Sequence, residues 1–174
     1  MSRPQGRVVL INGISGAGKT SLARDLAPML GLPLFSQDDF KETFFDFGPD
    51  GIPAKALGML AIEALWTAAT AVPASIIESN WHRERDREFA IAGLQRANLE
   101  VVVEIYCRVD VDVALARAAS RARHPVHSGD QFTMAHWRRL AEGAIPIELS
   151  PVLELDTSQQ IDLPKLVQAV RALF

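Results

Sequence analysis

The chain contains little that would suit an oxidising environment. Cys107 is the only cysteine among 174 residues, so no intrachain disulfide and no cysteine-based metal cluster can form. Cys107 also ends an apolar run that begins at Val101, where a packed thiol is expected rather than a reactive nucleophile. We therefore predict a reducing, cytoplasmic location.

Long hydrophobic runs and dense basic segments are also missing. The most apolar long stretch, residues 52–72, is interrupted by Lys55 and Glu63 and predicts a buried or amphipathic helix instead of a membrane span. The formal net charge is -3 and no dense Lys/Arg block occurs, which argues against binding of nucleic acid through a basic surface. We expect no membrane partner, keep nucleic acid only as an alternative, and leave monomer and homodimer both open.

Strand and helix patterns alternate along the whole chain. Short β-branched or apolar runs predict strands at residues 7–12, 33–36, 74–78, 99–107 and 152–155. Helical spacing predicts helices at residues 19–30, 40–43, 53–71, 84–96, 111–121, 134–142 and 163–173. Such alternation predicts an α/β fold with three layers, in which a five-stranded parallel sheet has helices on both faces. No repeat or linker divides residues 1–174, which we expect to form a single domain.

A glycine-rich loop follows the first predicted strand. Residues 13–20, GISGAGKT, satisfy the pattern G-x-x-x-x-G-K-[ST] and lead directly into a helix. The glycines let successive backbone N–H groups turn inward around an anion, and the helix adds the positive end of its dipole. Lys19 can reach the β and γ phosphates, and the Thr20 hydroxyl is a candidate Mg²⁺ ligand. We predict nucleotide contacts from Gly13, Ser15, Gly16, Ala17, Gly18, Lys19, Thr20 and Ser21.

Two adjacent carboxylates, Asp38 and Asp39, follow the second predicted strand, which we expect beside the first. Ligands of parallel α/β sheets gather at the carboxyl ends of the strands, so these residues are candidates for chemistry. One Asp within reach of an acceptor hydroxyl suffices as a base, and Asp38 is assigned that role. The alternative is that one of the pair, Asp39 in particular, caps the short helix that follows.

Lys41 and Phe44 follow the carboxylate pair. They are candidates for a basic contact and an aromatic wall around an acceptor. The alternative is that Lys41 is a solvated surface lysine and Phe44 a core aromatic, with no role at an acceptor.

The third predicted strand ends at Glu78, close to His82 and Arg83. Glu78 could support Mg²⁺ through water or could touch the acceptor, and Arg83 is a candidate acceptor contact. Because His82 lacks metal-binding neighbours at useful spacing, we expect it to be a surface or hydrogen-bonded histidine.

Arginines are concentrated after the fourth predicted strand. Arg117 and Arg121 lie four residues apart on one helical face, and Arg123 follows. Permanently charged guanidinium groups suit stacking on a base and neutralising charge on a transferring phosphoryl group. With the polar loop beyond them, they predict a lid at about residues 121–133 that excludes water when it closes over ATP. An ordinary basic surface helix is the alternative.

Together these motifs resemble the small P-loop kinases, the AAA-type predicted kinases related to polynucleotide kinase, gluconate kinase, zeta toxin and chloramphenicol phosphotransferase. The resemblance implies a fold like that of the nucleoside monophosphate kinases with an arginine-bearing lid. Residues 38–41, DDFK, are similar to a polynucleotide kinase segment, which implies that Asp38 is the base and Lys41 an acceptor contact. Residues 117–124 are similar to the R-x-x-x-R-x-x-H lid segment of gluconate kinases, which places Arg117 and Arg121 at the nucleotide. The D-T-S of residues 156–158 implies that Thr157 borders the adenine. Glu78 departs from the family pattern, which has an aspartate there.

These observations favour an ATP-dependent kinase that uses Mg²⁺. Asp38, Lys19 and Arg121 are its candidate catalytic residues, and Asp39, Lys41, Phe44, Glu78 and Arg83 its candidate acceptor contacts. The γ-phosphoryl group would pass to a hydroxyl of a small molecule. A 5′-hydroxyl nucleic-acid kinase and a nucleotide-dependent NTPase or switch with no small acceptor are the alternatives.

Overall fold

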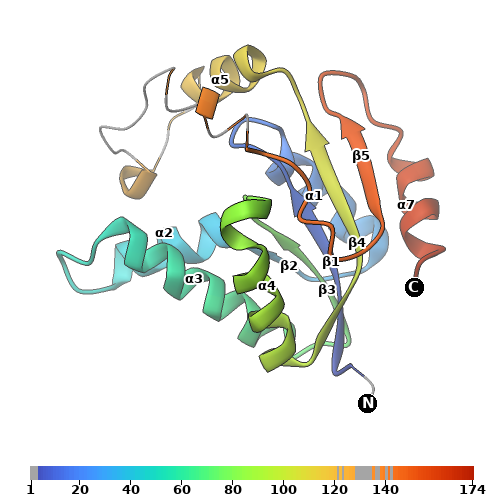
Figure 1. Ribbon diagram of the computed structural model, residues 1–174, viewed down its shortest axis with the longest axis horizontal. Helices are drawn as coiled ribbons and strands as arrows, with labels where there is room; N and C mark the ends of the chain where they lie inside the picture. The colour runs from blue at the N-terminus through green and yellow to red at the C-terminus, as the bar shows by residue number, and fades with distance from the viewer. Residues whose placement is uncertain are drawn as a thin grey trace.

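The computed structural model describes residues 4–120, 122, 124–127, 135, 138, 139, 141 and 143–174. Five strands form one sheet in the order β2-β3-β1-β4-β5, and every neighbouring pair is parallel (Figure 1). The strands are β1 (Gly6–Asn12), β2 (Leu34–Ser36), β3 (Ala74–Glu78), β4 (Leu99–Arg108) and β5 (Val152–Asp156). The predicted five-stranded parallel sheet is confirmed.

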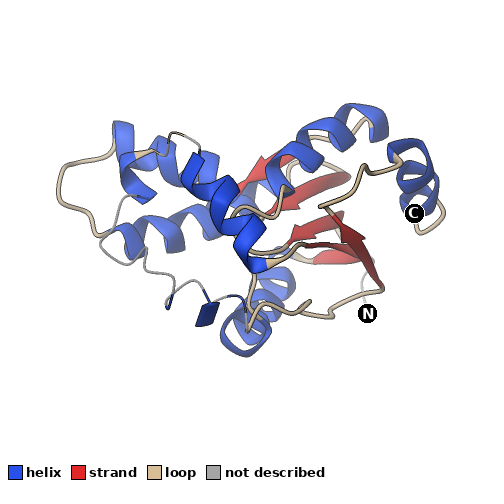
Figure 2. Cartoon of the chain, turned by 90° about the horizontal axis from the view of Figure 1, so that it is seen from above, coloured by secondary structure: helices blue, strands red, loops and turns tan. Residues whose placement is uncertain are grey.

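Helices connect the strands and lie on both faces of the sheet. They are α1 (Lys19–Leu30), α2 (Gln37–Phe47), α3 (Ala54–Ala69), α4 (Arg83–Ala97), α5 (Val111–Ser120), the 3-10 turn η1 (Pro125–His127) and α7 (Leu163–Arg171). In Figure 1, α2 and α3 lie to the left of the sheet and α7 lies at its right. Figure 2 shows the strands enclosed by helices.

Alternating residues of β1 explain the three layers. Val9 and Ile11 pack in one core cluster with side chains of α1, α5 and α7. Val8 and Leu10 pack on the opposite face with side chains of α3 and α4. A central strand buried on both faces needs a continuous apolar run, which is what residues 8–11 provide.

Three predictions about the elements are corrected. β2 does not lie beside β1, because β3 pairs with both and separates them. The helix expected at residues 40–43 is longer and begins at Gln37, with Ser36 at the N-cap position. Asp39 is therefore not the cap and lies with Asp38 in the first turn of α2.

The helix expected at residues 134–142 falls mostly outside the described residues. Among the helices within the described part of the chain, none is long and apolar enough to cross a bilayer.

Candidate active site

The loop between β1 and α1 is a tight turn closed by a hydrogen bond within its own backbone. Gly16 and Gly18 adopt φ angles of 83° and 80°, a left-handed conformation that favours glycine. The Ala17 N–H donates to the Ile14 carbonyl oxygen at 3.0 Å, and Gly18 is the N-cap residue of α1. A helix N-terminus that follows such a loop presents backbone N–H groups to an anion.

The Lys19 side chain lies inside this loop. The residue is only 8% exposed, and its Nζ donates to the Ile14 carbonyl oxygen at 3.1 Å. The same Nζ lies 3.9 Å from Oε1 of Glu78, a residue that is 3% exposed at the end of β3. Because a buried ammonium needs a counter-charge, Glu78 balances the charge of Lys19.

Glu78 links the loop to the carboxylate pair of α2. The β2–β3 register sets Ser36 beside Glu78, and the Ser36 hydroxyl donates to Oε2 of Glu78 at 2.8 Å. Burial raises the pKa of Glu78, while Lys19 and the Ser36 hydrogen bond oppose that rise. The charges of Asp38 and Asp39 raise the pKa of Glu78 further. The loop lysine and three carboxylates thus share one electrostatic environment at the carboxyl edge of the sheet.

The two aspartates of α2 have different neighbours. Asp39 Oδ1 lies 3.7 Å from Nη2 of Arg24, which belongs to α1. Asp38 Oδ1 lies 3.9 Å from Nε2 of His127 in η1. Among the described arginines, Arg24 pairs with Asp39 and none pairs with Asp38, so Asp38 is the better candidate for a base that must accept a proton.

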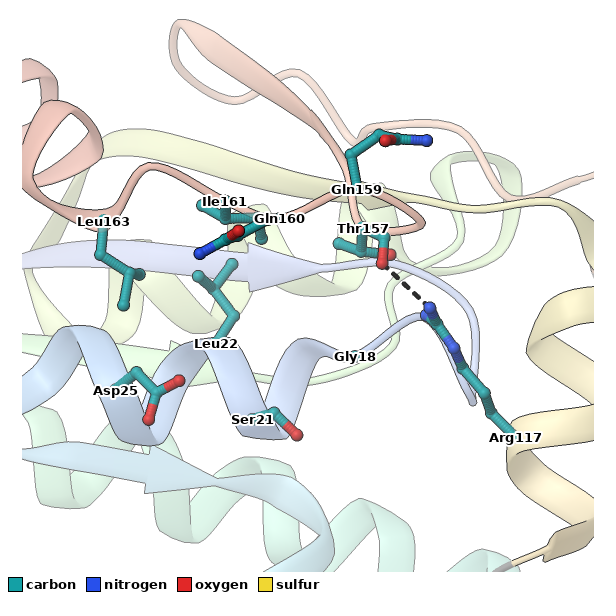
Figure 3. Close-up of a pocket in the computed structure, with 10 residues that line it drawn as sticks. All are labelled: Gly18, Ser21, Leu22, Asp25, Arg117, Thr157, Gln159, Gln160, Ile161 and Leu163. Atoms are coloured by element: carbon teal, nitrogen blue, oxygen red, sulfur yellow. Dashed lines mark hydrogen bonds between the residues drawn. The ribbon is translucent and has the colours of Figure 1, made fainter.

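A pocket of about 490 Å³ opens on the other side of the loop (Figure 3). The Arg117 Nη2 points toward the loop after β5 and donates to the Thr157 carbonyl oxygen at 3.1 Å. Residues of α1, of its N-cap, of the β5–α7 loop and of the start of α7 form the rest of the wall: Gly18, Ser21, Leu22, Asp25, Gln159, Gln160, Ile161 and Leu163. The pocket is therefore continuous with the end of the phosphate loop at Gly18.

Comparisons with known proteins identify the family of this chain. The AAA domain family matches residues 8–146. A candidate kinase from Chloroflexus aurantiacus is 31% identical, with a TM-score of 0.84 over 98% of this chain and 99% of that one. The chain belongs to the AAA-domain small P-loop kinases. No curated protein matches the sequence.

More distant P-loop kinases share the fold alone. Shikimate kinase from Acinetobacter baumannii, solved with shikimate, is 18% identical, with a TM-score of 0.59 over 99% of this chain and 93% of that one. A gluconokinase from Sinorhizobium meliloti is 15% identical, with a TM-score of 0.57 over the same shares. The expected fold, like that of the nucleoside monophosphate kinases, is thereby confirmed.

Other predicted site residues of this P-loop kinase are placed as follows. Arg83 Nε donates to the Pro146 carbonyl oxygen at 2.7 Å, and the guanidinium also pairs with Glu148. Phe44 is half-buried, with its ring 6.3 Å from that of Phe40. Lys41 is half-buried on α2.

Two lid arginines, Arg121 and Arg123, lie outside the described residues, as does most of the predicted lid at 121–133. The structure therefore leaves their roles as predictions.

Two expectations about single residues have clear outcomes. Cys107 is buried, and burial raises the pKa of its thiol to about 12, so the prediction of a packed thiol is confirmed. His82 was expected to be a surface or a hydrogen-bonded histidine. It is only 7% exposed and hydrogen-bonded to the Gly143 backbone, so the second alternative holds. Burial lowers the pKa of His82 and favours its neutral form.

Sequence reasoning missed a buried carboxylate behind the phosphate loop. Glu104 of β4 is fully buried and accepts hydrogen bonds from Asn12 Nδ2 at 2.8 Å, Ile147 N at 3.0 Å and Glu148 N at 2.9 Å. Asn12 Oδ1 in turn accepts from Gly13 N at 2.6 Å. An acid inside an apolar run was the available signal, but its partners lie more than forty residues away.

Glu104→Ala is expected to lower the free energy of unfolding by about 3–5 kcal/mol, because it leaves buried donors without an acceptor. Glu100 lies on the same strand but is exposed, so Glu100→Ala serves as the control, with an expected change within about 0.5 kcal/mol. Urea unfolding of both variants measures the difference. Equal stabilities would contradict a structural role for the buried carboxylate.

Gly16→Ala is expected to weaken MgATP binding roughly tenfold or more. A Cβ at Gly16 would lie 2.1 Å from the Ala114 carbonyl oxygen of α5, and the φ angle of 83° adds strain. The matched control is Gly58→Ala in α3, where a Cβ meets Gln37 Nε2 at an ordinary 3.9 Å. Calorimetric titration with MgATP checks the pair, and equal affinities would show that this loop conformation is not needed for binding.

Proposed function

We propose that the protein is an ATP-dependent phosphotransferase that moves the γ-phosphoryl group to a hydroxyl of a small molecule. The observation that carries the proposal is the contact of Lys19 with Glu78. The hydrogen-bond partner of Glu78, Ser36, directly precedes the first turn of α2, which holds Asp38 and Asp39. A phosphate loop alone supports binding. A carboxylate set beyond the phosphates adds a group that can receive the proton of an acceptor.

The donor is proposed to be ATP, with its phosphates in the loop and its base in the pocket of Figure 3. Backbone N–H groups of residues 13–20 receive the phosphates, and Lys19 exchanges part of its contact with Glu78 for phosphate oxygens. Arg117 and Thr157 line that pocket and are proposed to border the base. Arg121 and Arg123 are proposed to complete the lid and neutralise charge on the transferring group.

The residues near the loop fit a magnesium ion that arrives with the nucleotide. Within the described ranges, no three His, Cys, Asp or Glu side chains group as a metal site. Mg²⁺ in such enzymes needs only one or two protein oxygens, with phosphates and water as its other ligands. The Thr20 hydroxyl would bind the ion, and the Glu78 carboxylate would act through water. The ion would neutralise charge on the phosphate oxygens.

Asp38 is proposed to act as the base of the transfer. The acceptor hydroxyl gives its proton to the Asp38 carboxylate while its oxygen bonds to the γ-phosphorus. The bond from that phosphorus to the oxygen bridging to the β-phosphate breaks, and ADP leaves with the electron pair. Asp39, Lys41, Phe44 and Arg83 are proposed to hold or shape the acceptor from α2 and the start of α4.

An acceptor panel tests this function directly. Labelled ATP is incubated with the protein and with hydroxyl-bearing metabolites, antibiotics and a 5′-hydroxyl oligonucleotide. We expect label on a small molecule. Label on the oligonucleotide alone would favour a nucleic-acid kinase, and release of inorganic phosphate with every compound would favour an NTPase.

A further inference from the structure

Helix α2 carries two further carboxylates on the same face as Asp38, and the proposed transfer does not involve them. Asp38, Glu42 and Asp46 are spaced four residues apart, which brings them onto one side of the helix. We call these three residues the carboxylate stripe. Like charges at this spacing repel one another, so the stripe needs donors or cations opposite it.

The turn η1 supplies two histidines to the carboxylate stripe. His127 Nε2 lies 3.0 Å from Glu42 Oε1 and 3.9 Å from Asp38 Oδ1. His124 Nε2 lies 2.9 Å from Asp46 Oδ1, and the two imidazole rings are 6.4 Å apart. The turn is therefore docked on α2 at both ends of the stripe, although about eighty residues separate the partners in sequence.

His127 is more buried than a residue in an ordinary surface ion pair. Its side chain is 14% exposed, whereas that of Asp38 is 49% exposed. Val126, its neighbour in η1, is buried and anchors the turn. The buried imidazole thus lies beside the Asp38 carboxylate, which itself stays half-exposed.

We propose that His127 is a positioning residue for Asp38, holding the carboxylate toward the acceptor while its own proton is bonded to Glu42. This inference rests on the proposed function, since it assumes that Asp38 is the base. In the neutral form, Nε2–H donates to Glu42 and the ring limits the rotamers open to Asp38. In the protonated form, the added proton lies on Nδ1 and Nε2–H stays with Glu42, but the ring now carries a positive charge 3.9 Å from Asp38 Oδ1. That charge stabilises the Asp38 carboxylate and makes it a weaker acceptor of the proton of the hydroxyl.

The surroundings favour the neutral form at neutral pH. Burial has the largest effect and lowers the pKa of His127, and the Lys41 ammonium lowers it further. The carboxylates of Asp38 and Glu42 raise it. Among the described residues, His124, which pairs with Asp46, also lies beside His127. Turnover is therefore expected to rise with pH as His127 loses its proton.

Titration of the histidines by NMR tests the contact without turnover. In Asp38→Asn, the pKa of His127 is expected to fall, because a carboxylate that stabilises the imidazolium is gone. Asp46→Asn is the matched control on the same stripe, and there the His127 titration is expected to stay unchanged. Equal effects of the two variants on His127 would overturn the inference.

Kinetics test the consequence for the reaction. His127→Gln keeps a donor for Glu42 but cannot be protonated, so we expect kcat within about threefold of the parent and no histidine limb at acid pH. His127→Ala is expected to lower kcat about tenfold, with the KM for ATP unchanged. A parental kcat and pH profile in His127→Ala, or an equal loss in both variants, would overturn the role.

The two proposals fail in different ways. If Asp38→Asn shifts the His127 titration but keeps full turnover, the contact is real and the assignment of Asp38 as base is wrong. If turnover depends on Asp38 but the His127 titration does not, the proposed function stands and this inference is wrong.

Discussion

Lys19→Ala is expected to lower kcat/KM for ATP by about 1,000-fold or more. The ammonium lies inside the phosphate loop, 3.1 Å from the Ile14 carbonyl oxygen, where it can meet both bridging and terminal phosphate oxygens. Its loss removes attraction for the bound nucleotide and stabilisation of charge that develops during transfer. Calorimetric titration with MgATP measures the loss of nucleotide binding, and steady-state kinetics measure the loss of turnover.

The control for this variant is Lys55→Ala, an exposed lysine at the start of α3, for which we expect parental values. Because Lys19 also balances buried Glu78, Lys19→Ala must be checked for folding by circular dichroism. Lys19→Met, which keeps most of the side-chain volume, is the second variant. If either folded variant bound MgATP as tightly as the parent, the assignment of the phosphate loop would be wrong.

Asp38→Asn is expected to lower kcat by about 100- to 10,000-fold while the Kd for MgATP stays within about twofold. The amide has nearly the shape of the carboxylate but cannot take a proton from the acceptor. Asp38 lies in the first turn of α2, outside the phosphate loop at residues 13–20, so we expect nucleotide binding not to depend on it directly. Single-turnover measurements with labelled ATP separate transfer from product release.

The control for Asp38→Asn is Asp50→Asn, the same substitution in the exposed turn between α2 and α3. We expect it to leave kcat unaltered. If Asp38→Asn kept full turnover with every acceptor, the assignment of Asp38 as the base would be wrong. Asp39→Asn would then be the next variant to measure, since Asp39 occupies the same helical turn.

Local patterns were sufficient to predict much of the fold. The β-branched run of β1, followed by glycines and a lysine, predicted both the strand and the start of α1 at Lys19. Gly31, in a left-handed conformation, ends α1 where the sequence predicted the end. Such signals depend on neighbouring residues, so they can be read from one sequence.

Features that depend on distant partners could not be predicted in this way. The position of β3 between β2 and β1 follows from packing of the whole sheet. Glu104 seemed an interruption in an apolar strand, because its donors come from Asn12 and from residues 147 and 148. The proposed role of His127 likewise depends on the contact of η1 with α2. In each case the deciding contact joins segments far apart in sequence.

The stoichiometry of the transfer tests the central claim most directly. The purified protein is incubated with MgATP and the best acceptor from the panel, and ADP, inorganic phosphate and phosphorylated acceptor are quantified by mass spectrometry and phosphate assay. The account predicts one phosphorylated acceptor for each ADP formed, with little inorganic phosphate, and loss of that product in Asp38→Asn. Equal amounts of ADP and inorganic phosphate, at a rate that no acceptor changes, would contradict it.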